Sequence, residues 1–205
     1  FLFLFLPPTL PKGYPTWIVV NHVWMRHVCP RVLPAKSPAH CANMLSSIFG
    51  GGAAAFVQAA TAGLAGGHAG AGVVAAAVFS FTRLTWMYSI QGEVFALNNL
   101  LVAALLFVLV RFQARPRLST ALLGAFLCGV ELTNQLTAVL YIVIIVPWVL
   151  YMLHQRGELT ALRLVALALV FLVGFSPYAF MPLSALQNTA RLTWGDQRTL
   201  AGFLK

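Results

Sequence analysis

The chain has 205 residues, of which 60% are hydrophobic and only 8% are charged. Soluble domains average about 45–50% apolar and about 25% charged residues, so this composition excludes an ordinary water-soluble domain. The formal net charge is +9, but the thirteen Lys and Arg residues are scattered between apolar segments, which excludes the basic stripe of a nucleic-acid-binding protein.

Residues 1–12 lack the length of a membrane span. The apolar stretch Phe1–Leu6 is interrupted at once by Pro7 and Pro8, whereas a transmembrane helix needs about 20 apolar residues. The basic start and small-residue cleavage site of a signal peptide are also missing. We therefore expect a truncated or misjoined N-terminus over residues 1–12.

The next segment, residues 13–28, is amphipathic and rich in Trp and Tyr. Its polar residues suit a helix at the membrane surface better than a clean span; they are Asn21, His22, Arg26 and His27. Cys29 and Cys41 flank a proline-rich loop and would pair if that loop faced an oxidising lumen, or else remain free thiols. Cys128 is expected to pack within a helix, and the five His residues show no metal-ligand spacing.

Six apolar segments follow, separated by charged or glycine-rich breaks. The predicted fold is an all-α integral membrane protein, a multi-pass transmembrane helical bundle over residues 13–182 with an interfacial helix first. The stretch GLAGGHAGAG between the first two segments suits either close helix packing at Gly63 and Gly67 or a tight turn. The segments are about residues 41–63, 70–81, 94–110, 119–135, 136–153 and 161–182.

The positive-inside rule orients these segments. The loops around Arg111–Leu118 and His154–Glu158 carry several basic residues and are expected on the cytoplasmic side. Strict alternation then places the polar connection Arg83–Glu93, the junction Thr133–Gln135, the loop 30–40 and the tail 183–205 together on the luminal side. Arg31 and Lys36 lie on that side against the rule. The tail is expected to be a luminal juxtamembrane segment that leads to a further luminal region.

Only four carboxylates occur in the chain, and charge at membrane depth is costly. Glu131, Asn134 and Gln135 share one helical face, which suits either a binding cleft or hydrogen bonds between helices. Glu93 opens a span, where a carboxylate favours the helix dipole or lines a cleft. Glu158 is expected to be a solvated loop residue.

The tail places basic, aromatic and acidic residues close together at Arg191, Trp194, Asp196 and Arg198. An Arg side chain offers a fork of donors to phosphate, and a Trp ring offers a flat surface to sugar or lipid. The alternative interpretation is an interfacial anchor with solvated charges.

Four strings in this order resemble the transmembrane protein 260 family over about residues 13–204. They are KGYP, FSFTRLTWMYSIQGEVFALNNL, ELTNQLT and YAFMPLSALQNTARLTWGDQRTLAGFL. The resemblance implies a multi-pass GT-C type protein O-mannosyltransferase of the endoplasmic reticulum membrane. Such an enzyme transfers mannose, with inversion, from dolichyl-phosphate mannose to Ser or Thr of receptor domains of the immunoglobulin-like, plexin-type (IPT) class, and needs no cofactor or metal.

The resemblance also implies roles for residues inside the matching motifs. Glu93 would be the catalytic cleft carboxylate, and Arg83 or Arg191 would bind the donor phosphate. The other expected substrate-binding residues are Asn134, Gln135, Trp194 and Asp196.

The chain departs from the family pattern at three places. The acidic Gly-Gly-Asp-Ser-Gly-Glu motif has no counterpart ahead of Gly13, Leu10-Pro11-Lys12 replaces His-Pro-Pro, and Leu136 stands where the family has His. The chain is therefore expected to be an incomplete form, with its activity in isolation left open. A transporter or channel that uses Glu93 and Glu131 to bind an ion is the alternative function, and it would need polar groups along a path open to both sides of the membrane.

Overall fold

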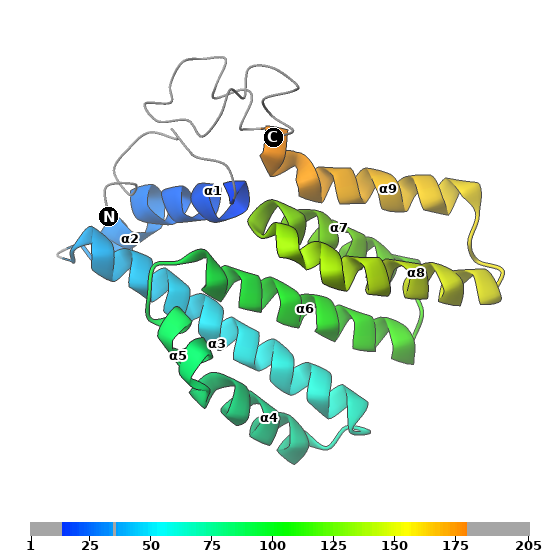
Figure 1. Cartoon of the computed structure of the whole chain (residues 1–205), viewed down its shortest axis with the longest axis horizontal. Helices are drawn as coiled ribbons and strands as arrows, with labels where there is room; N and C mark the ends of the chain where they lie inside the picture. The colour runs from blue at the N-terminus through cyan, green and yellow to red at the C-terminus, as the bar shows by residue number, and fades with distance from the viewer. Residues whose placement is uncertain (1–13, 35, 180–205) are drawn as a thin grey trace.

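The computed structural model of the protein describes residues 14–34 and 36–179, and every regular element among them is a helix. The longer helices lie side by side along the longest axis of the molecule (Figure 1). The predicted all-α multi-pass membrane fold is therefore confirmed. The expected N-terminal segment 1–12 and the tail 183–205 lie outside the described residues.

The helices follow one another with short connections. The segment before the first long helix contains α1 (Pro15–Val23), a π-helical turn (Trp24–Val28) and α2 (Cys29–Val32). The rest are α3 (Pro38–Leu64), α4 (Ala69–Phe81), α5 (Arg83–Ser89), α6 (Val94–Ala114), α7 (Leu118–Asn134), a 3-10 turn (Leu136–Ala138), α8 (Val139–Gln155), α9 (Ala161–Phe175) and the 3-10 turn η4 (Ser176–Ala179).

The structure corrects the predicted number of full spans. Among the described residues, four segments are long and apolar enough to cross a membrane, namely Pro38–Leu64, Val94–Ala114, Leu136–Gln155 and Ala161–Ala179. Helices α4 and α5 are bent by 73° at their junction and count as one further span only together. Helix α7 has 17 residues, which is about 26 Å at 1.5 Å per residue. The structure also shows that the connection predicted over Arg83–Glu93 contains a helix, α5 (Arg83–Ser89).

The loops divide between the two ends of the bundle as the alternation predicted. One end, here called the Asn134 end, holds α1, the starts of α3, α6 and α8, and the ends of α7 and α9 (Figure 1). The opposite end, called the Arg115 end, holds the connections α3–α4, α6–α7 and α8–α9 (Figure 1). The basic loops with Arg115 and Arg156 therefore share one end.

Glycines set two features of the packing. Gly66 and Gly67 have φ values of 67° and 95° and form the turn between α3 and α4, so the turn interpretation of that stretch is confirmed. Helices α7 and α9 cross in backbone contact at Gly129 and Gly174. A Cβ at Gly129 would overlap the carbonyl oxygen of Phe171, and one at Gly174 would overlap that of Phe126.

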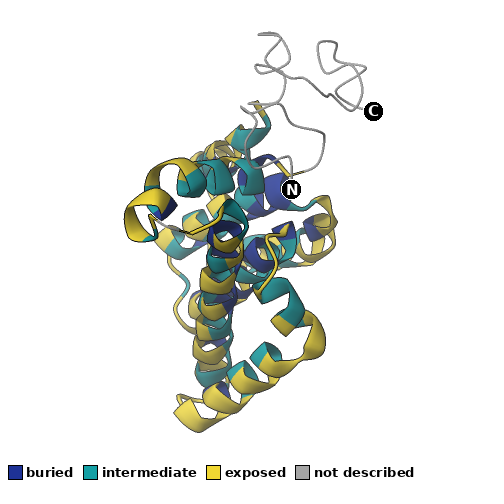
Figure 2. Cartoon of the chain, turned by 90° about the vertical axis from the view of Figure 1, so that its left-hand side faces the viewer, coloured by how far each residue is buried: buried dark blue, intermediate teal, exposed yellow. Residues whose placement is uncertain are grey.

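The outer faces of the bundle are apolar and exposed. Figure 2, which views the bundle from the Asn134 end, shows buried residues between the helices and exposed ones outside. Large hydrophobic side chains such as Ile144 on α8 and Leu162 on α9 are 71% and 79% exposed. In a soluble protein such a surface would drive aggregation, but it is the surface that lipid tails require. Toward the Arg115 end, Phe112, Ala121, Leu153 and Leu167 form a small core.

Candidate functional site at the Asn134 end

A cluster of polar side chains is buried where α7 ends. The exposed fraction of Glu131 is 1%, and that of Thr133 and Asn134 is 0%. These residues fall within the last turn of an otherwise apolar helix, and Gln135 leaves the helix with an extended backbone. We call Glu131, Thr133, Asn134 and Gln135, which lie together at the end of α7, the polar cluster.

Helix α1 covers this cluster. The Thr133 hydroxyl donates to the carbonyl oxygen of Val130 at 2.7 Å, and so the Thr16 hydroxyl, which is also buried, donates to Thr133. Residues of α1 and α7 also contact η4, which follows α9. The polar cluster is thus enclosed by α1, the end of α7 and η4.

Most polar atoms of the cluster have no hydrogen-bond partner within the described part of the chain. The unpartnered buried atoms of the cluster are both carboxylate oxygens of Glu131, both side-chain polar atoms of Asn134, and the side-chain carbonyl oxygen of Gln135. Each such neutral group costs about 1–3 kcal/mol, and a charged group costs more. The side chains of Glu131 and Asn134 therefore form no hydrogen bonds with other described residues. Hydrogen bonding between helices was one of the two roles predicted for them.

An apolar cavity of about 450 Å³ lies between α6, α7, α8 and α9. It reaches from Phe112 and Ala121 to Cys128 on α7, and Cys128 precedes Glu131 by three residues, which is about one helical turn. Cys128 is buried and free, as expected. One face of α7 therefore joins an apolar cavity within the bundle to the polar cluster at its end.

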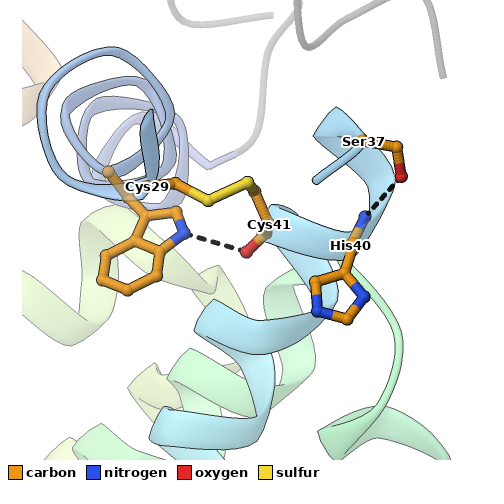
Figure 3. Close-up of a disulfide and its surroundings, with 5 residues drawn as sticks. Cys29, Ser37, His40 and Cys41 are labelled. Atoms are coloured by element: carbon orange, nitrogen blue, oxygen red, sulfur yellow. Dashed lines mark hydrogen bonds between the residues drawn. A yellow bond between two sulfur atoms is a disulfide. The ribbon is translucent and has the colours of Figure 1, made fainter. Parts of the chain in front are cut away.

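A disulfide between Cys29 and Cys41 ties α2 to the first turn of α3, with the two Cα atoms 5.9 Å apart (Figure 3). The pairing is one of the two alternatives that the sequence left open. The indole nitrogen of Trp24 donates to the carbonyl oxygen of Cys41 at 2.8 Å, and the Ser37 side chain caps α3 by accepting from the backbone nitrogen of His40 (Figure 3). The covering segment is therefore covalently anchored to the bundle.

The structure brings together only some of the predicted site residues. Asn134 and Gln135 lie in the polar cluster, whereas Glu93 is exposed immediately before α6 and Arg83 is exposed at the start of α5. The predicted residues Arg191, Trp194 and Asp196 lie outside the described residues. Residues 14–34 and 36–179 contain no group of three His, Cys, Asp or Glu side chains that could hold a metal ion.

Glu158 lies in the loop before α9, as predicted, and its partly exposed side chain also has a partner. Its carboxylate forms an ion pair with Arg163 at 2.8 Å, and both side chains are about one-third exposed. The same Arg163 guanidinium donates to the carbonyl oxygen of Glu158. Glu158 therefore fixes the start of α9 at the Arg115 end.

Sequence reasoning missed Thr16 as a neighbour of the cluster. Thr16 lies 117 positions from its hydrogen-bond partner Thr133, and no local pattern links two such distant residues. The available signal was the polar character of residues 13–28, which predicted a helix at the membrane surface.

Comparisons with known proteins give a consistent result. The family described as "Protein O-mannosyl-transferase TMEM260 N-terminal domain" matches residues 8–159 of this chain. The mouse (Mus musculus) Protein O-mannosyl-transferase TMEM260 is 44% identical over 198 residues, which cover 95% of this chain and 27% of the mouse protein. The Dictyostelium discoideum protein of that name is 32% identical over 209 residues, covering 95% of this chain and 25% of its own length.

The chain thus spans about a quarter of the length of these curated relatives. No solved structure matches it.

Proposed function

The chain belongs to the TMEM260 family of protein O-mannosyl-transferases, and from this premise we propose that the protein containing it transfers mannose from dolichyl-phosphate mannose to Ser or Thr residues of acceptor proteins. The proposed acceptors are IPT-type domains of plexins and related receptors. The proposed site of action is the endoplasmic reticulum membrane, with the Asn134 end facing the lumen.

One observation carries the proposal of a lipid-linked donor. The apolar cavity and the polar cluster are joined along one face of α7 through Cys128 and Glu131. A polyprenyl chain is apolar and suits the cavity, whereas the sugar end of the same molecule needs hydrogen-bonding groups. An amphiphile of this kind satisfies both halves of the site at once.

The proposed catalytic carboxylate is Glu93. Inverting transfer needs a carboxylate near the acceptor hydroxyl and cationic groups near the departing phosphate. Glu93 is exposed at the Asn134 end, where a protein acceptor can approach it. Arg83, also exposed, is proposed to bind the donor phosphate together with Arg191 of the tail, while Asn134, Gln135, Trp194 and Asp196 bind substrate.

The polar groups favour transfer over transport. They gather in the polar cluster at one end of the bundle, and the cavity that continues from it has an almost wholly apolar lining. An ion pathway would need polar or charged groups along its length. The luminal position of the site is also supported by the disulfide, because disulfides form in oxidising compartments such as the endoplasmic reticulum lumen.

The test is mannose transfer to an IPT domain in membranes that lack the endogenous enzyme. The complete protein is expected to transfer mannose, as detected by mass spectrometry of the acceptor. The Glu93→Ala variant is expected to lose about 100-fold or more in rate at equal expression, because it lacks the carboxylate near the acceptor hydroxyl.

Glu158→Gln is the matched control, since Glu158 forms its ion pair at the opposite end of the bundle. An unchanged rate for Glu93→Ala would remove Glu93 from the catalytic role. Absence of transfer by well-expressed complete protein would contradict the proposed function itself.

A further inference from the structure

The unpartnered atoms of the polar cluster are mostly hydrogen-bond acceptors. They comprise four side-chain oxygens, from Glu131, Asn134 and Gln135, and one amide nitrogen from Asn134. Buried polar groups in native proteins are paired almost without exception. The cluster therefore requires a partner that both donates and accepts hydrogen bonds.

This inventory discriminates between the chemical groups of an amphiphilic ligand. A phosphate diester brings only acceptor oxygens, so it would leave the side-chain carbonyl oxygens of Asn134 and Gln135 unpaired. An apolar chain would satisfy none of the polar atoms. A sugar presents several hydroxyl groups, each of which donates one hydrogen bond and accepts others, and so matches both the four oxygens and the single amide nitrogen.

We propose that Glu131, together with Asn134 and Gln135, binds the sugar hydroxyl groups of the lipid-linked donor. This inference rests on the proposed function and assigns to Glu131 a substrate-binding role that distinguishes the sugar from its lipid phosphate carrier. Glu131 and Asn134 lie three positions apart on one face of α7, and Gln135 follows directly at the end of the helix, so the three residues lie within about one helical turn of one another.

The position of Glu131 fits this role. It lies one turn beyond Cys128, which lines the apolar cavity, so a lipid chain in the cavity can direct its head group toward the Asn134 end. Helix α1 packs against the end of α7 and contacts Thr133 through Thr16.

The experiment measures binding of two lipids to the complete protein in lipid nanodiscs. The probes are dolichyl-phosphate mannose and dolichyl phosphate, which differ only in the sugar. The Glu131→Gln variant is expected to bind the mannose-bearing lipid about tenfold more weakly, because an NH2 group replaces one carboxyl oxygen and cannot accept from a sugar hydroxyl. Its affinity for dolichyl phosphate should stay within about twofold of wild type.

Two further variants sharpen the measurement. Glu158→Gln removes a carboxylate at the opposite end of the bundle and should leave both affinities unchanged. Gln135 lies beyond the last residue of α7, where folding tolerates substitution better than at the buried Glu131. The Gln135→Ala variant should weaken binding of the mannose-bearing lipid alone.

Two other outcomes would overturn the inference. Equal weakening for both lipids, accompanied by a lower melting temperature, would assign Glu131 a structural role. Unchanged affinity for both lipids would mean that the polar cluster does not contact donor. Selective weakening without any mannose transfer by the wild-type protein would support this binding site while contradicting the proposed function, so the two failures are distinguishable.

Discussion

The hydroxyl of Thr16 connects helix α1 to the bundle by a hydrogen bond to Thr133. It donates to Thr133, whose own proton is used by the Val130 carbonyl oxygen. Replacing Thr16 by Val keeps the shape and removes the donor, so Thr133 loses one partner in a site with 0% exposure. We expect the free energy of unfolding to fall by about 1–2 kcal/mol.

Thermal unfolding in detergent measures this change. The matched control is Thr137→Val, because Thr137 is exposed and its hydroxyl is free to bond water. If Thr16→Val unfolds at the temperature of the control variant, the Thr16 contact does not hold α1 on the bundle.

Residue-scale prediction from the sequence succeeded where the signal was local. Glu131, Asn134 and Gln135 lie three and four positions apart, and helical geometry alone gathers them on one face. The burial of that face under α1 was not predictable, because it depends on contacts between residues more than 100 positions apart. The ion pair of Glu158 with Arg163 was not predicted for a related reason, since Arg163 is held in place only once α9 begins at Ala161.

At the scale of elements, the crossing of α7 and α9 offers a pair of substitutions with opposite expected signs. A methyl group at Gly129 would overlap the carbonyl oxygen of Phe171, which belongs to backbone and has little freedom to move. Gly129→Ala is therefore expected to destabilise the protein by about 1–3 kcal/mol. Gly51 in α3 has open space around an added methyl group, so Gly51→Ala is expected to be neutral or stabilising by up to about 1 kcal/mol.

The two glycine variants are compared by their melting temperatures in the same detergent. Because both carry the same Gly→Ala change inside a helix, the difference between them isolates the steric term. Equal melting temperatures would show that α7 and α9 do not cross in backbone contact at Gly129.

The sequence predicted most elements correctly because apolar length is a local property. Each of the six apolar segments contains a helix, and the turn at Gly66 and Gly67 was among the predicted alternatives. Helix α5 was missed, since its polar and aromatic residues lack the apolar length that marks a span. The number of full spans was overestimated for the same reason, because a 13-residue helix such as α4 is only about 20 Å long.

For the whole molecule, the disulfide is a test of which side of the membrane the Asn134 end faces. Cys29 and Cys41 are joined, and Cys128 is free within the bundle. Among these three cysteines, only Cys128 should be alkylated when protein isolated from the endoplasmic reticulum is denatured without reductant, and all three should be alkylated after reduction, as located by mass spectrometry of the peptides. Alkylation of Cys29 and Cys41 before reduction would contradict the pairing and its luminal position.

Removing the disulfide should also loosen the cover over the polar cluster. The Cys29→Ser and Cys41→Ser double variant is expected to lose about 2–4 kcal/mol of stability. Pulsed proteolysis between α2 and α3 measures the loss, since α2 ends at Val32 and α3 begins at Pro38. Protease resistance equal to wild type would mean that Trp24 and Thr16 hold the segment without the covalent bond.

The short helix α7 has a consequence for the membrane in which the protein resides. It contains 17 residues, which correspond to about 26 Å of helix. Tilting can shorten the reach of a helix but cannot lengthen it, so a thick bilayer must thin around α7. The hydrocarbon core is about 27 Å in the endoplasmic reticulum and about 32–33 Å in the plasma membrane. Hydrophobic mismatch would therefore oppose onward movement to the cell surface, and helix length itself would act as a retention signal.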